Sequence, residues 1–151
     1  MVPATNRKLR ARRYTPGMVR PIDTSLEPVR TFLNDQNDIR LSIVFGSAAT
    51  GRQTPESDLD IAVLARAPLT SERKQKLVQA LAGIVERPVD LIDLSAVGEP
   101  LLGRILHEGR RLSGSSDTWA AILSSHLIDA ADFLPYRERM LEERRASWTR
   151  P

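Results

Sequence analysis

Hydrophobic and polar positions follow two different periods along this chain. Residues 24–37 and 70–86 space their apolar side chains three and four positions apart, as one face of a helix requires. Residues 40–45, 58–64 and 89–94 are instead short runs rich in Val, Ile and Leu, the pattern of buried strands. The first part of the chain is therefore predicted to read helix, strand, strand, helix, strand.

The second part of the chain is predicted to be mostly helical. Residues 99–108 have the apolar spacing of a short helix, and residues 111–112 are expected to add an edge strand. From Asp117 the helical period continues almost to the end of the chain. Pro135 is expected to break or kink this run, because proline lacks the N–H that a helix interior needs, and a charged helix follows over 136–148.

The connections between the strands restrict the topology. Residues 48–57 form a loop with room for about one helical turn, too short for a crossover, so the first two strands should pair antiparallel. The third strand follows a helix and is expected beside the second. We predict an α+β fold, a small mixed β-sheet covered by helices. Residues 1–22 would be an arm, 23–114 the core and 115–151 a helical extension.

Charge separates the arm from the rest of the chain. Of the 22 Lys and Arg residues, six lie in residues 1–22, which contain no acid, so the remainder carries a net charge of −3. A solvated, disordered extension is the favoured interpretation. The alternatives are an arm that binds nucleic acid, a mitochondrial presequence, or a true start at Met18 that removes most of the segment.

Composition excludes several classes of protein. The chain has no cysteine, so disulfides and thiolate metal sites are ruled out. No apolar run approaches the roughly 18 residues of a membrane span, and no secretory signal is evident. We therefore expect a cytoplasmic protein that does not enter a membrane.

Carboxylates occupy corresponding positions in two of the predicted strands. Asp58 and Asp60 alternate with apolar residues, so both should point to one face, and Asp90 repeats the pattern in the third strand. Bare carboxylates this close repel unless a cation lies between them. Oxygen ligands favour Mg²⁺ or Mn²⁺, so three converging acids predict a site for two such ions.

Gly46-Ser47 ends the first predicted strand and supplies the other half of a site. Glycine lets the backbone approach a phosphate closely, and the N–H groups and hydroxyl that follow can donate to phosphate oxygens. Each of these features alone is a common turn or strand end. Together, in this order, they predict a binding site for a triphosphate.

The motif set resembles a known signature. Gly46-Ser47, a ten-residue gap, Asp58-Leu59-Asp60 and then Val89-Asp90-Leu91 are similar to the pattern of the DNA polymerase β-like nucleotidyltransferase superfamily. The resemblance covers residues 40–94 and agrees with the predicted order of helices and strands. Within the superfamily, the chain resembles the minimal nucleotidyltransferase (MNT) antitoxins, which pair with helical ribonuclease toxins of the HEPN class.

This resemblance implies roles for individual residues. Asp58 and Asp60 would bind Mg²⁺ on the triphosphate, and Asp90 would complete a second metal site and help deprotonate the acceptor. Gly46 and Ser47 would hold the β- and γ-phosphates. Two further residues are assigned to nucleotide binding, although relatives often have a basic residue before the loop glycine and this chain has one after it: Arg52 and Ser57.

The resemblance also implies the reaction and its partner. The enzyme would transfer AMP from ATP to a tyrosine hydroxyl of a cognate HEPN toxin, in a hetero-oligomer with that toxin. The alternatives are a transferase that modifies a small molecule, as aminoglycoside-modifying relatives do, and a non-catalytic module that neutralises its toxin by contact. An RNA-tailing enzyme that uses the basic arm is a third alternative.

Three other polar residues are left outside the predicted site. His107 and His126 have no acidic partner at ligand spacing and are expected at the surface or in packing. Asp93 lies three positions after Asp90 and should face the other side of the sheet.

Overall fold

The computed structural model describes residues 23–148, without the side chains of 132–138 and 140–148. The prediction for the arm, residues 1–22, lies outside the described residues. Ten elements follow in chain order: η1 Thr24–Leu26, α1 Glu27–Asn34, β1 Ile39–Phe45, α2 Gly46–Thr50, β2 Leu59–Ala65, α3 Ser71–Val85, β3 Val89–Asp93, α4 Leu101–Glu108, β4 Arg110–Gly114 and α5 Ser116–Trp148.

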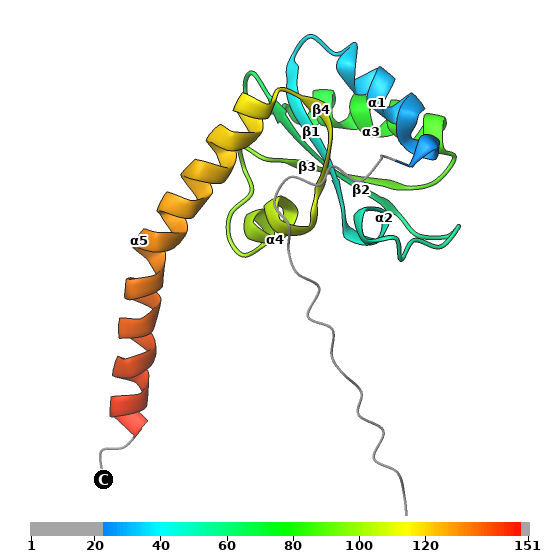
Figure 1. Cartoon of the computed structure of the whole chain (residues 1–151). Coiled ribbons are helices and arrows are strands. Elements are labelled where there is room, and N and C mark those ends of the chain that lie inside the picture. The colour runs from blue at the N-terminus through cyan, green and yellow to red at the C-terminus, as the bar shows by residue number, and fades with distance from the viewer. Residues whose placement is uncertain (1–22, 149–151) are drawn as a thin grey trace, which may run out of the picture.

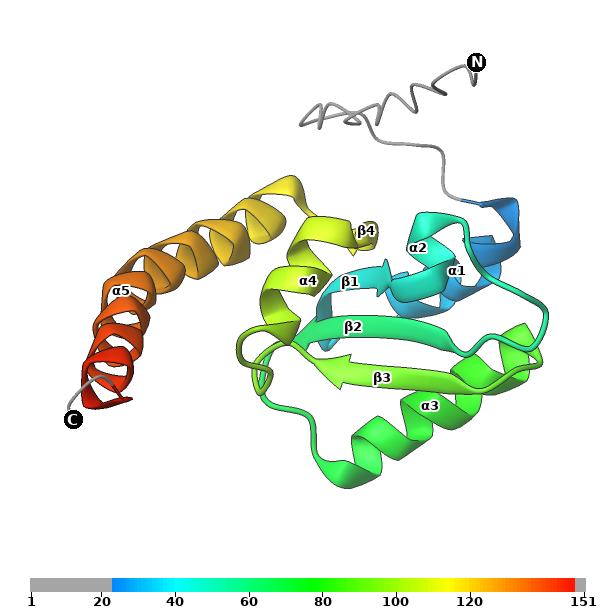
Figure 2. The same cartoon turned by 90° about the horizontal axis from the view of Figure 1, so that it is seen from below.

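The four strands form one mixed sheet in the order β3-β2-β1-β4. β1 pairs antiparallel with β2 on one side and with β4 on the other. β3 runs parallel to β2, and α3 makes the crossover between them (Figure 2). The predicted α+β class, the antiparallel first pair and the neighbouring third strand are confirmed.

Helices cover both faces of this sheet, as Figure 1 shows. On one face the odd-numbered residues of β2 pack beneath α1 and α3. On the other face, residues of β1 and β2 pack beneath α4 and the first turns of α5. Strand residues alternate between the faces, so consecutive side chains of β2 enter different cores. The first core includes Leu59, Ile61, Leu77 and Leu81, and the second includes Ile43, Ala62, Ile105 and Leu106.

Side-chain caps explain where α3 and η1 begin. The Thr70 side chain accepts a hydrogen bond from the Arg73 N–H and so caps α3. Asp23 likewise accepts from the Ser25 N–H at the start of η1. The helix predicted over 24–37 is shorter than expected, because a 3₁₀ turn precedes α1 and α1 ends at Asn34.

The last helix differs most from its prediction. α5 is a single helix of 33 residues, so the break expected at Pro135 is wrong. Its first turns pack on the sheet through Trp119, Ile122 and Leu123. Farther along, Leu127 and Ile128 are 58% and 63% exposed, and the helix extends away from the sheet (Figure 1). Among the described residues, no helix combines the length and apolar character needed to cross a membrane.

Candidate active site

The strand register brings two of the predicted acids together. Asp60 is the direct partner of Asp90 on β3 and of Phe45 on β1. Paired residues on neighbouring strands lie about 4.8 Å apart and point to the same face. The two carboxylates therefore stand side by side at one end of the sheet, on the face that α4 covers.

Gly46, the first residue of the Gly46-Ser47 motif that is predicted to bind phosphate, lies against Asp60 of this acid pair. It follows Phe45 directly, begins α2 and has a φ of +64°, a left-handed conformation that favours glycine. A Cβ at this position would overlap the Asp60 carboxylate. The Asp60 side chain thus lies against the backbone at the start of α2, and the helical turn that begins there starts with the N–H groups of Gly46 and Ser47.

Asp58 is placed differently from the other two acids. It lies outside β2, which begins at Leu59, so its predicted position inside the strand is wrong. The Leu59 N–H donates to the Pro88 carbonyl at 2.9 Å, ahead of the regular pairing of β2 with β3. The Asp58 side chain is exposed, whereas Asp60 is half-buried.

Asp60 is the electrostatic centre of the site. Burial raises its pKa above the usual value, and the negative charges of Asp90 and Asp58 raise it further. Arg104 on α4 acts in the opposite direction, because its positive charge lowers the pKa of Asp60. The negative charges of Asp58 and Asp90 thus disfavour the ionised form of Asp60, and a cation that joins the cluster would favour it.

The donor atoms of this cluster suit a hard divalent cation. All are carboxylate oxygens, the ligands that Mg²⁺ and Mn²⁺ prefer. In the part of the chain that the structure describes, no three Asp, Glu, His or Cys side chains already stand at the spacing of a metal site. Asp58 and Asp90 are exposed and free to change rotamer, so a bound cation would draw their carboxylates toward Asp60.

The two residues with weaker assignments lie in the loop after α2. The Ser57 hydroxyl accepts from the Thr54 N–H at 2.9 Å and hydrogen-bonds the Thr54 hydroxyl, which shapes the turn before Asp58. Arg52 is exposed, and its backbone N–H donates to the Ser47 carbonyl at 3.0 Å. These contacts favour the role in loop capping for Ser57, and nucleotide binding by either residue stays a prediction.

Asp93 stays outside the site. Its carboxylate accepts from the Leu69 N–H at 2.8 Å and from the Ser95 N–H at 2.9 Å. Burial opposes its charge, but these hydrogen bonds outweigh burial and lower its pKa. Asp93 therefore fixes the connections around β3 at the end of the sheet opposite the acid pair.

His126 has a partner that the sequence did not reveal. Its Nδ1 lies 2.5 Å from Oε1 of Glu99, and its side chain is 14% exposed. The other Glu99 oxygen accepts from the Gly103 N–H. This contact joins α5 to the turn before α4, so the expected packing role of His126 agrees with the structure.

Sequence reasoning missed two arginines that the fold brings to the acids. Arg104 comes from α4, more than forty residues after Asp60, and its charge acts on that carboxylate. Arg87 follows α3 and contacts the loop before Asp58, donating to the Ser57 carbonyl. Neither belongs to a local motif, so only the register of the strands could have placed them.

Comparisons with known proteins agree with this geometry. The family model described as polymerase beta, nucleotidyltransferase matches residues 27–118. Protein adenylyltransferase MntA of Shewanella oneidensis (strain MR-1) is 36% identical over 77 residues, or 51% of this chain and 55% of that protein. The chain thus spans about half the length of this curated relative.

Solved structures share the fold. A chain in the crystal structure of a toxin-antitoxin with AMP-PNP matches with a TM-score of 0.69 and 24% identity, over 80% of this chain and 98% of that one. A chain in the structure of a tri-AMPylated Shewanella oneidensis HEPN toxin in complex with MNT antitoxin matches with a TM-score of 0.65 and 23% identity, over 79% and 94%. At these identities the matches show a common fold.

Proposed function

This chain belongs to the polymerase β nucleotidyltransferase family, and from that premise we propose that it is a protein adenylyltransferase of the MNT type. It transfers AMP from ATP to a tyrosine hydroxyl of a cognate HEPN toxin and thereby acts as the antitoxin of the pair. The observation that carries this proposal is the register of Asp60 with Asp90, beside the left-handed Gly46.

The support for the acceptor comes from relatives. The curated relative is a protein adenylyltransferase, and a chain of the same fold comes from a complex with an AMPylated HEPN toxin. Another comes from a toxin-antitoxin structure with AMP-PNP, an ATP analogue, which favours ATP as the donor. For this chain we therefore propose a complex of antitoxin and toxin. It would form in the cytoplasm, where ATP is abundant.

Each part of the site has a task in this reaction. The N–H groups of Gly46 and Ser47 donate to the β- and γ-phosphates and hold the triphosphate in place. Asp58, Asp60 and Asp90 would hold two Mg²⁺ ions, or Mn²⁺, which supply positive charge for the triphosphate and for the developing negative charge. The acids at this end of the sheet would thus place that positive charge next to the phosphates held by Gly46 and Ser47.

The bond changes are those of an in-line displacement. The tyrosine oxygen forms a bond to the α-phosphorus of ATP while the bond to the β-phosphate oxygen breaks, and pyrophosphate leaves. The proton of the tyrosine hydroxyl passes to Asp90, the more exposed member of the strand pair. AMP remains on the toxin as a phosphodiester.

Transfer of label tests the proposal. The full-length protein is incubated with ATP labelled at the α-phosphate, Mg²⁺ and the HEPN protein encoded beside it. We expect label on the toxin, lost in Asp60→Asn and retained in Asp35→Asn, which changes an exposed aspartate at the other end of the sheet. Toxin neutralised without label, or equally well by Asp60→Asn, would instead identify a non-catalytic binding module.

A further inference from the structure

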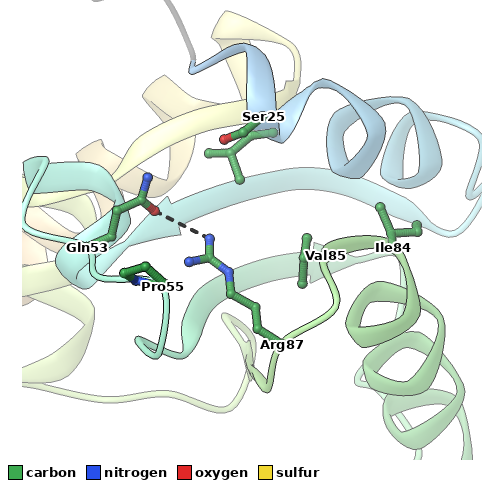
Figure 3. A pocket seen from close by; sticks show the side chains of 7 residues that line it. Ser25, Gln53, Pro55, Ile84, Val85 and Arg87 are labelled. Atoms are coloured by element: carbon green, nitrogen blue, oxygen red, sulfur yellow. Dashed lines mark hydrogen bonds between the residues drawn. The ribbon is translucent and has the colours of Figure 1, made fainter.

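The loop between α2 and β2 is held in place without a buried side chain. From Gly51 to Asp58 every residue is exposed or half-buried. Beneath the loop lies a cavity of about 340 Å³, bordered by Leu26 of η1, Ile84 and Val85 of α3 and Pro55 of the loop itself (Figure 3). Apolar packing therefore contributes little to the position of the loop, and polar contacts must determine it.

Arg87 spans this cavity and supplies such contacts. Its Nη2 donates to Oε1 of Gln53 at 3.4 Å, and its Nη1 donates to the Ser57 carbonyl at 3.5 Å. Figure 3 shows the guanidinium directed at Gln53 from across the cavity. The Gln53 amide in turn donates to the Asp23 carboxylate at 3.3 Å. The loop is thus connected to the α3–β3 turn on one side and to the start of η1 on the other.

The contacts of Arg87 and Pro88 flank one acid. Arg87 binds the carbonyl of Ser57, and Pro88 accepts the N–H of Leu59, so two consecutive residues hold the backbone immediately before and after Asp58. Asp58 lies outside the strand and is exposed, so no ladder of strand hydrogen bonds fixes it. The position of its carboxylate depends on these flanking contacts.

We propose that Arg87 is a positioning residue that sets the place of Asp58 in the metal-binding cluster. It acts through the loop backbone and does not touch the nucleotide. A guanidinium is suited to this task, because its rigid planar fork directs donors on separate nitrogens at two acceptors at once, whereas a lysine carries its three donors on one nitrogen at the end of a flexible stem. The inference rests on the proposed function, since it assumes that Asp58 binds a divalent cation.

Binding of Mn²⁺ to the nucleotide-free, full-length protein tests this proposal apart from catalysis. Residues that orient a metal ligand typically contribute about 10–100-fold to metal affinity. We expect Arg87→Gln to weaken Mn²⁺ binding about 10-fold, measured by electron paramagnetic resonance, and Arg87→Lys to weaken it less. Gln53→Met, which removes the partner of Arg87 in the loop, should act in the same direction.

Arg66 provides a matched control. Its Nε donates to the Asn37 carbonyl at 3.0 Å at the opposite end of the sheet, so Arg66→Gln removes a similar contact between arginine and backbone. This variant should bind Mn²⁺ as the wild type does. Hydrogen exchange over residues 51–58 should increase in Arg87→Gln and not in Arg66→Gln. Melting temperatures confirm that each variant is folded.

Failure of the inference can be told apart from failure of the proposed function. Mn²⁺ affinity unchanged in both Arg87→Gln and Gln53→Met, with affinity lost in Asp60→Asn, overturns the role of Arg87 alone. An equal loss in Arg66→Gln also overturns it, because the effect would then be general. A wild type that binds no Mn²⁺ without nucleotide overturns this inference, whereas a lack of label transfer to the toxin is what overturns the proposed function.

Discussion

Asp60 and Asp58 are two residues apart in the sequence, yet the fold holds them by different means. Asp60 lies within β2, flanked by hydrogen-bonded strands on both sides, and half-buried. Asp58 lies at the end of an exposed loop, and the contacts that hold the backbone beside it come from Arg87 and Pro88. A strand fixes a ligand at the cost of desolvating its charge, whereas a loop leaves the charge solvated but its position weakly determined.

The difference predicts that changes at the strand acid have the larger effect on catalysis. Asp60→Asn would remove the proposed metal ligand that the strand pairing holds in place, and we expect adenylyl transfer to fall on the order of 1,000-fold. Asp58→Asn should cost less, because the exposed loop can readjust. Single-turnover rates with labelled ATP measure both variants, and equal losses would show that the strand and the loop hold their acids equally well.

Gly46→Ala should displace the Asp60 side chain in β2 without replacing any of the acids. The new Cβ would overlap the Asp60 carboxylate and occupy a left-handed conformation, so the side chain must move. We expect a loss of activity of about 100-fold, the usual result of a displacement near 1 Å, and a loss of stability of about 1–3 kcal/mol.

Gly51→Ala is the control for this substitution. Its φ is also positive, at +74°, but a Cβ there meets no atom within 4 Å. It should therefore lose stability through backbone strain while keeping most of the activity. Equal losses of activity in the two variants would attribute the effect of Gly46→Ala to strain and not to Asp60.

The two aspartates should also differ in their effect on the free energy of unfolding. Here the substitution of Asp60 is expected to be favourable, whereas its effect on catalysis is unfavourable. The pKa of Asp60 is raised by burial and by its acidic neighbours, so stability falls as pH rises from the usual aspartate pKa through the raised value. At neutral pH without divalent cations, Asp60→Asn should stabilise the protein by on the order of 1 kcal/mol. Asp58→Asn should change it by less than about 0.5 kcal/mol. Urea denaturation in a chelator separates them, and no gain in Asp60→Asn would contradict the electrostatic account.

An acid at the far end of the sheet is expected to have a small effect on stability. Arg73 donates to both oxygens of Asp38, at 2.6 and 2.8 Å, and these hydrogen bonds hold the pKa of Asp38 below its usual value. The contribution to stability is present above the usual pKa and is lost as pH falls through the lowered one. Because the pair is partly exposed, we expect Asp38→Asn to cost about 0.5–1 kcal/mol at pH 7 and progressively less as the pH falls below the usual aspartate pKa. Denaturation across this pH range measures it.

Much of this arrangement could be predicted from the sequence because it depends on local patterns. Alternation in β2 and β3 placed Asp60 and Asp90 on one face, and the short loop after Phe45 required an antiparallel pair. The sequence pattern predicts a start of β2 one residue too early. Asp58 continues the alternation of polar and apolar residues, but it lies outside the hydrogen-bonded strand. Boundaries of this kind depend on partners, which periodicity does not report.

Two features could not be read from local patterns. Arg87 has the sequence context of an ordinary surface residue after a helix, and its importance arises only when the loop thirty residues earlier folds over it. The sequence pattern predicts that Pro135 breaks or kinks the last helix, but α5 is one continuous helix. Because α5 extends away from the sheet, water can satisfy the backbone carbonyl that proline leaves without a donor, and the helix continues.

The parallel pairing of β2 with β3 also sets the order in which the site can form during synthesis. β1 and β2 are a local hairpin, but Asp90 meets Asp60 only after α3 has folded back, and β4 must still close on β1. Contacts between distant segments form late, because the chain must first lose the entropy of the intervening loop. A nascent chain that ends before residue 89 contains Gly46-Ser47, Asp58 and Asp60 but lacks Asp90. Assembly of the complete acid cluster is thereby deferred until most of the chain has left the ribosome.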